Sequence, residues 1–311
     1  MDGQVYLDEI KQFQSSLLHY LDEGQNLQNY PNLIKFLKDQ FSRKRPKEIK
    51  ETLRLISKIS KNHHRSPNFI DKIDQFLINF KNEIKQTFSN YEIFSIFKNN
   101  KRLLLFLLKE SILTFDQTIV DQINYNKYWD ANYIKFFLPE CKPYITENLY
   151  NEIEGDIHSS NSDEFEEKRK IGENELQICE LIRNDSIDEF IVFVNRTNAS
   201  LSMKIPSSIF ETNRFLYKKS PTLLEYSAFF GSIQIFKFLF LNGIEFTPSL
   251  CLYAIHGDNP DIIHHLEENN ASISYNDCFI EAIKCFCNDV AYYILNNYLD
   301  IQDDLIDSYF P

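Results

Sequence analysis

The sequence predicts an all-α protein, in which an N-terminal helical domain is followed by a C-terminal solenoid of helix pairs. Three observations support this prediction. Apolar residues recur at spacings of three and four along most of the chain, as on one face of an amphipathic helix. The 311 residues include only 7 glycines and 10 prolines, too few for a fold built from many tight turns. A motif also recurs near the C-terminus at steps of 26 and 28 residues, which is typical of stacked helical units.

Residues 1–150 form the predicted N-terminal domain. Four amphipathic helices are expected before residue 85, and from Tyr91 onward the helical segments become shorter. The short segments of 88–150 are consistent with further degenerate helix pairs. The apolar positions that define the four helices are Ile10, Phe13, Leu17 and Leu21; Leu33, Ile34, Leu37 and Phe41; Ile49, Leu53, Ile56 and Ile59; and Phe69, Ile73, Phe76 and Phe80.

Residues 151–172 are predicted to be an acidic linker. The stretch 151–175 carries 3 Lys and Arg against 9 Asp and Glu, and it has almost no apolar periodicity. Dense charge with low hydropathy favours a solvated segment over packed structure. Within it, residues 165–171 have the pattern of a short helix that would dock onto the following domain.

Residues 173–311 form the predicted repeat domain, and its strongest unit runs from Thr222 to Gly243 as TLLEYSAFFGSIQIFKFLFLNG. In this unit Ala228 stands three residues before Gly231, and two aliphatic–aromatic pairs follow in the second helix. The skeleton returns at Ala254 with Gly257, and once more at Ala282 with Cys285 in the glycine position. Each such unit is too small to bury its own apolar face, so the units are expected to stack.

This pattern resembles the ankyrin repeat. Leu224 holds the leucine position of the Thr-Pro-Leu-His opening, Ser227-Ala228 hold the paired small residues, and Gly231 and Gly243 hold the two turn glycines. Glu225 stands in place of the histidine, and the opening Thr-Pro is missing. The run from about Phe165 to Leu295 is also similar to a degenerate ankyrin-type domain of unknown function found in large protist families. The resemblance implies a helix-pair fold and a role in protein binding, with no known activity to carry over.

Charge and hydropathy restrict the possible partners. The net charge is −12, with +4 on residues 1–150, −6 on 151–175 and −10 on 176–311. The acidic second half would repel phosphate backbones, so we expect no nucleic-acid partner, whereas a basic protein partner would be attracted. No apolar run approaches the roughly 20 residues of a membrane span. Scattered cysteines and the absence of a secretory signal pattern predict a cytoplasmic protein, with nuclear entry left open by the basic run 43–47.

The signatures of common enzymes are absent from the sequence. No phosphate-binding loop, dinucleotide-binding motif, nucleophile elbow or zinc-protease motif can be written from it, and no cofactor is expected. Cysteines and histidines gather near the C-terminus, but their spacings do not suit a zinc site, and small buried thiols between repeats are the simpler interpretation. We therefore predict no metal site. The candidate ligands weighed were Cys251, His256, His264, His265, Cys278, Cys285 and Cys287.

The functional prediction is a non-enzymatic scaffold or adaptor, with the binding surface on the concave side of the stack. The alternative is a regulatory subunit or effector with a cryptic enzymatic activity in residues 1–150, which a deep pocket with several buried titratable residues would favour. Phe229 and Phe230 are large aromatics where the ankyrin framework requires none. They could instead pack against the insertion 195–219 or a neighbouring unit. The predicted binding surface consists of Phe229, Phe230, Ile255, His256, Glu245 and Tyr275.

Overall fold

The computed structural model describes seven segments of the chain, and within them it is all-α, as predicted. Apart from a single bridge between Lys204 and Thr222, no β-structure occurs in these segments. None of their helices combines the length and apolar character needed to cross a bilayer. The described residues are 3–22, 30–43, 45–63, 68–125, 131–157, 162–269 and 273–299.

The chain forms two compact units. Unit 1 comprises residues 1–61, 67–174 and 208–213, and unit 2 comprises residues 62–66, 175–207 and 214–311. The chain passes from unit 1 to unit 2 between Asn174 and Glu175, close to the predicted end of the linker. Residues 300–311 of the predicted repeat domain lie outside the described part of the chain.

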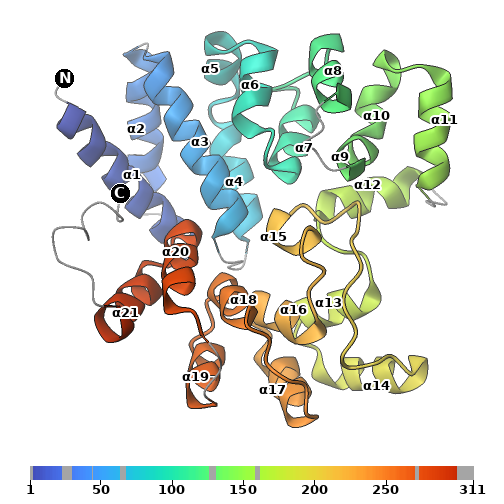
Figure 1. Cartoon of the computed structure of the whole chain (residues 1–311). Coiled ribbons are helices and arrows are strands. Elements are labelled where there is room, and N and C mark those ends of the chain that lie inside the picture. Colours follow the sequence, from blue (N-terminus) through green and yellow to red (C-terminus); the bar gives the residue numbers. More distant parts are fainter. Residues whose placement is uncertain are drawn as a thin grey trace. The chain divides into compact units, whose positions relative to one another are not determined.

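Unit 1 is built from twelve described helices and one 3₁₀ turn (Figure 1). The expected apolar faces are buried in it: Ile49, Leu53, Ile56 and Ile59, for example, have no exposed surface. The elements are α1 (Gly3–Asp22), α2 (Tyr30–Ser42), α3 (Pro46–Asn62), α4 (Phe69–Ile78), α5 (Lys81–Thr87), α6 (Asn90–Phe97), α7 (Lys101–Lys109), α8 (Gln117–Tyr125), α9 (Ala131–Phe136), α10 (Leu138–Cys141), the 3₁₀ turn Lys142–Tyr144, α11 (Glu147–Asp156) and α12 (Ser162–Ile171).

The segment predicted as a solvated acidic linker is instead packed into unit 1, apart from residues 158–161, which are not described. Almost all of the described part of this segment belongs to helices α11 and α12. Phe165 is buried, and its ring lies 5.4 Å from that of Phe210. Arg169 is 0% exposed and pairs with Glu140 and Glu166. A few buried apolar side chains and the buried Arg169 with its two carboxylate partners therefore hold this segment in unit 1 despite its high charge.

Unit 2 contains four successive helix pairs and the one-turn helix α15 (Arg214–Tyr217). The first helices of neighbouring pairs pack against each other, α13 with α16, α16 with α18 and α18 with α20. Among the second helices, α14 packs with α17 and α17 with α19. The pairs are α13 (Gln177–Arg183) and α14 (Ile187–Thr197), α16 (Leu223–Phe229) and α17 (Ile233–Leu241), α18 (Leu250–Gly257) and α19 (Pro260–Glu268), and α20 (Tyr275–Cys285) and α21 (Asn288–Tyr298) (Figure 1).

The turn inside each pair contains one residue in the left-handed region. These residues are Asp185, Gly231, Asp258 and Phe286, each directly before the N-cap of the second helix. Gly231 therefore corresponds to Asp258, and not to Gly257 as the alanine spacing indicated. The corrected steps from Gly231 are 27 and 28 residues.

The corrected register also changes which small residues are equivalent. Four residues before the left-handed position of the last three pairs stand Ser227, Ala254 and Ala282, and all three are fully buried. The first pair has the larger, half-buried Leu181 there. Small side chains at this position let the first helices of neighbouring pairs approach closely.

The N-cap residues of the second helices link each pair to the one before it. Ser232 Oγ donates to the carbonyl oxygen of Ile182 at 2.5 Å, and Cys287 Sγ donates to that of Ile255 at 3.6 Å. Asn259 Nδ2 donates to the Gly231 carbonyl at 2.9 Å. The accepting carbonyls lie in the last turns of α13 and α18 and in the turn after α16, where the helical ladder supplies no regular donor.

Glu225, at the position where the resemblance to ankyrin repeats led us to expect a histidine, is buried and forms a capping box with Thr222. Its Oε1 atom also accepts hydrogen bonds from Thr247 Oγ1 and Ser249 Oγ, both at 2.6 Å. Because these hydroxyls lie just before α18, Glu225 joins the start of one pair to the start of the next. The carboxylate of Glu225 therefore has a structural role, since it accepts the hydrogen bonds that join the two pairs.

We predict that Gly257→Ala strongly destabilises unit 2. An added Cβ would lie 2.1 Å from the Ala228 carbonyl oxygen and 2.8 Å from the Gly231 nitrogen, both backbone atoms of the preceding pair. The neighbouring helix would have to move, at a cost of about 3 kcal/mol in the free energy of unfolding. Urea denaturation of the whole chain measures this cost.

Gly155→Ala is the matched control, because Gly155 lies within α11 and a Cβ there meets no atom within 4 Å. Alanine is the better helix former, so this variant should be as stable as the parent protein or about 0.5–1 kcal/mol more stable. Equal stability of the two variants would contradict the close approach described for Gly257.

Candidate functional site

The structure brings four of the six predicted site residues together. Phe229, Phe230, Ile255 and His256 all lie at the C-terminal ends of α16 and α18. Glu245 is exposed in the connection between α17 and α18. Tyr275 is half-buried at the start of α20, where its ring stacks on Tyr298 with centroids 3.8 Å apart.

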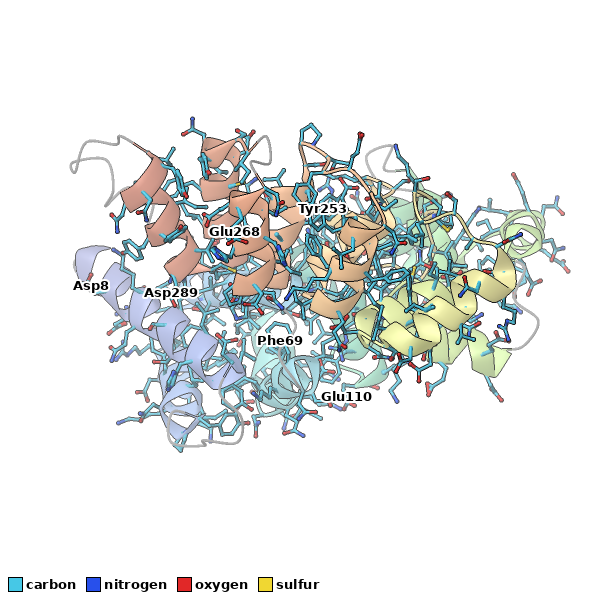
Figure 2. The ribbon with its side chains drawn as sticks, turned by 90° about the horizontal axis from the view of Figure 1, so that it is seen from below. Asp8, Phe69, Glu110, Tyr253, Glu268 and Asp289 are labelled. Carbon is cyan, nitrogen blue, oxygen red and sulfur yellow. The ribbon has the colours of Figure 1, made fainter. Side chains whose placement is uncertain are left out.

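Aromatic rings enclose the side chain of His256. The ring of Phe229 stacks on it at 4.8 Å, and Phe215 of α15 lies 4.4 Å away. Phe215 also meets Tyr253, a fully buried residue of α18 labelled in Figure 2, at 4.7 Å. We call Phe215, Phe229, Phe230, Tyr253 and His256 the aromatic cluster.

Half of the predicted binding surface is buried, Phe229 and His256 within the aromatic cluster and Ile255 against side chains of α20 and α21. Phe229 is 5% exposed, and Ile255 and His256 are buried as well. Phe229 contacts Phe215 of the insertion and His256 of the next pair. This packing is the alternative to a binding role that the sequence analysis left open. Side chains buried in this way stabilise unit 2 and are not available to a partner, whereas Phe230 remains half-buried.

A second group of polar side chains meets His256 from α20. His256 Nε2 lies 3.0 Å from Glu281 Oε1, and Lys284 Nζ donates to the other oxygen of Glu281 at 3.0 Å. Burial pushes the pKa of Glu281 upward, but the hydrogen bonds and charges of His256 and Lys284 outweigh burial and lower the pKa to about 2. The sequence analysis did not identify Glu281. The available signal was that Glu281 lies four residues before Cys285 on the same helix.

The thiol of Cys285 completes this group and is fully buried. Its sulfur lies 3.4 Å from Nδ1 and 3.6 Å from Nε2 of His256. A sulfur almost equally distant from both nitrogens cannot lie in the ring plane, because it would then overlap the Cε1 atom between them. Cys285 Sγ therefore sits over the face of the imidazole and away from the lone-pair direction of either nitrogen.

His256, Glu281 and Cys285 are the one group in the described residues that offers three metal-ligand atoms within 4.8 Å of one another. Zinc requires lone pairs that converge on one point, and a histidine binds metal in the plane of its ring. Here the sulfur lies over that ring, and Phe215 and Phe229 restrict its rotation. The geometry thus gives no support for a metal at this position, and the absence of a metal site stays a prediction.

A cysteine, a histidine and a carboxylate are also the components of a nucleophilic triad. Such a triad needs a thiolate that substrate can reach, aligned with a nitrogen of the base. Burial raises the pKa of Cys285 well above its ordinary value, and no surface of the thiol is exposed. The arrangement is therefore a buried polar network that holds α18 to α20.

A cleft of about 550 Å³ runs along α1 and α2 in unit 1. Its size falls within the range of small-molecule sites. The titratable residues that line it are Glu9, Lys35, Asp39 and Arg43, and none of them is buried. The cleft therefore lacks the buried titratable groups that would favour an enzymatic role for this unit.

Comparison with known proteins gives no match, whether to a family model, a curated protein or a solved structure. The resemblance to ankyrin repeats therefore rests on the residues quoted above.

We predict that Phe229→Ala lowers the free energy of unfolding by about 3–5 kcal/mol, because it removes a buried ring from the aromatic cluster. Tyr292→Ala, which truncates an exposed ring of α21, should change it by less than about 1 kcal/mol. Thermal and urea denaturation measure both effects. If the Phe229→Ala chain is as stable as the Tyr292→Ala chain, Phe229 does not stabilise the core and is again a candidate for contact with a partner.

We also predict an acid-dependent contribution from Glu281. Its pKa is lower in the folded chain than in the unfolded chain, so its contribution is complete above about pH 4.5 and is lost as the pH falls toward 2. The stability difference between the parent protein and Glu281→Gln should therefore shrink by up to about 3 kcal/mol over this range.

Glu268→Gln is the control, because Glu268 is exposed and its ion pair is with the exposed His264. The stability difference between this variant and the parent protein should stay nearly constant from pH 7 to pH 3. A Glu281→Gln difference that is equally constant would contradict the low pKa of Glu281.

Proposed function

We propose that this protein is a cytoplasmic, non-enzymatic scaffold or adaptor that binds other proteins through an ankyrin-like stack of helix pairs. The recurring contacts of unit 2 support the ankyrin-like part. A left-handed turn residue, a buried small residue four positions before it and an N-cap that reaches the preceding pair occur in successive pairs. Stacks of this kind present extended surfaces on which proteins bind.

The observation that carries the binding role is the apolar exposure of α14 and α17. Val192 on α14 is 64% exposed and Leu241 at the end of α17 is 81% exposed. Helix α14 has the sequence IDEFIVFVNRT, and among its six apolar residues only Phe190 is buried. Large apolar side chains this exposed on two helices that pack together support an interaction surface.

The neighbouring charges indicate the kind of partner. Asp188 and Glu189 are exposed on the first turn of α14, and residues 176–311 carry a net charge of −10. A partner with an apolar anchor flanked by basic residues would fit both features, with the charges mainly speeding the encounter. Of the residues first predicted for this role, Phe230, Glu245 and Tyr275 keep exposed surface that could contribute.

The test is affinity capture from cell extract with the full chain as bait, followed by quantitative mass spectrometry. Val192→Ser with Leu241→Ser should release specific partners, because serine removes the apolar anchors without adding charge. Asn195→Ser with Gln234→Ser is the control on the same two helices, since both residues are exposed and polar. Identical sets of captured proteins for the two double variants would contradict a role for this surface.

A further inference from the structure

Four of the six cysteines lie on α18, on α20 or at the N-cap of α21, and two of them, Cys251 and Cys278, lie on first helices that pack against each other. Cys251 stands one turn before Ala254 on α18, and Cys278 stands one turn before Ala282 on α20. Both alanines are fully buried where these helices pack together. Cys251 packs against the cluster of apolar side chains that contains Cys278. The hydrogen bond with Cys251 is also the largest cause of the raised pKa of the Cys278 thiol.

The two thiols differ in access to solvent. Cys251 is half-buried, whereas Cys278 is 1% exposed. Cys251 also borders a cavity of about 20 Å³ that Ile255, Tyr275 and Ile294 help to line. A cavity of that size holds about one water molecule, and hydrogen peroxide is only slightly larger.

The other cysteines are less suited to oxidation. Cys285 and Cys287 are buried, and Cys287 donates its thiol hydrogen to Ile255. Cys141 lies in unit 1, and Cys179 lies buried in the middle of α13. Cys251 is thus the one cysteine with partly exposed surface, and a second thiol lies within its reach.

We propose that Cys251 and Cys278 form a reversible disulfide when the protein meets a peroxide. Hydrogen peroxide first oxidises Cys251 Sγ to the sulfenic acid and leaves as water. Cys278 Sγ then attacks the oxidised sulfur, the S–S bond forms, and the hydroxyl group leaves with the Cys278 proton as a second water. Two thiols and one peroxide therefore give one disulfide and two waters, and a dithiol reductant reverses the reaction.

The order of these steps follows from the surroundings of Cys278. The hydrogen bond with Cys251 and its burial both raise the pKa of Cys278. It therefore remains a protonated thiol, which peroxide attacks slowly, until a sulfenic acid forms next to it. The resulting bond would fasten the last helix pair to the pair before it, whether or not the proposed protein-binding role is correct.

The test treats the full, fully reduced chain with hydrogen peroxide, blocks free thiols in denaturant and digests with Glu-C protease. Cleavage after Glu245, Glu267, Glu268 and Glu281 places the two cysteines in separate peptides, so only a disulfide keeps them together. The expected result is a linked pair of peptides that dithiothreitol separates. Cys251 oxidised without this link, a link between other cysteines, or no oxidation of Cys251 would overturn the proposal.

Two variants supply an independent readout. Cys278→Ser removes the resolving thiol, so a sulfenic-acid probe such as dimedone should label Cys251 at least five-fold more than in the parent protein. Peroxide should raise the melting temperature of the parent and of the control Cys179→Ser by about 5 °C, as expected for a closed loop of this length, but not that of Cys251→Ser. Equal labelling in the parent and Cys278→Ser, or equal melting shifts in all three chains, would count against the disulfide.

Discussion

The close approach of α16 and α18 at their C-terminal ends is the constraint on which the rest of unit 2 depends. Gly257 leaves no room for a Cβ against the Ala228 carbonyl, and the small residues Ser227 and Ala254 are fully buried nearby. With the first helices this close, the turn of one pair reaches the turn of the next, so that Asn259 can donate to Gly231. The same proximity brings Glu225 to the hydroxyls of Thr247 and Ser249.

Much of the fold could be predicted from periodicity, since apolar spacing alone located most of the long helices and the pairs of unit 2. The exact register of the repeats could not be predicted, because the sequence analysis used glycine to mark the turn of each pair. The left-handed turn position is occupied by Gly231 in one pair but by Asp258 and Phe286 in the next two. Asp visits this region at modest cost and Phe does so rarely, so neither residue marks the turn in sequence. The alanine spacing then selected Gly257, whose role is to leave space and not to supply a positive φ.

The linker prediction failed for a different physical reason. Composition measures how much charge a segment carries, but not whether that charge is paired. Arg169 lies near the rings of Phe136 and Phe165 and pairs with Glu166 of this segment and with Glu140 of α10, while most of the other acidic side chains of the segment stay exposed. The anchor Phe210 comes from residues 208–213, which rejoin unit 1 after the chain has entered unit 2. The local sequence gives no sign that residues 208–213 belong to unit 1.

In the candidate site, too, the local sequence predicted part of the arrangement, and residues distant in the sequence decide the rest. Local sequence placed Phe229 and His256 at equivalent ends of neighbouring helices, and the structure brings their rings together. Whether such rings face a partner or the core depends on what covers them, and Phe215, from an irregular segment, covers both. Among the described residues of unit 2, the two most exposed large apolar side chains, Val192 and Leu241, lie on second helices. The proposed binding surface therefore differs from the one expected from the sequence pattern, because a partner can contact only the side chains that the fold leaves exposed.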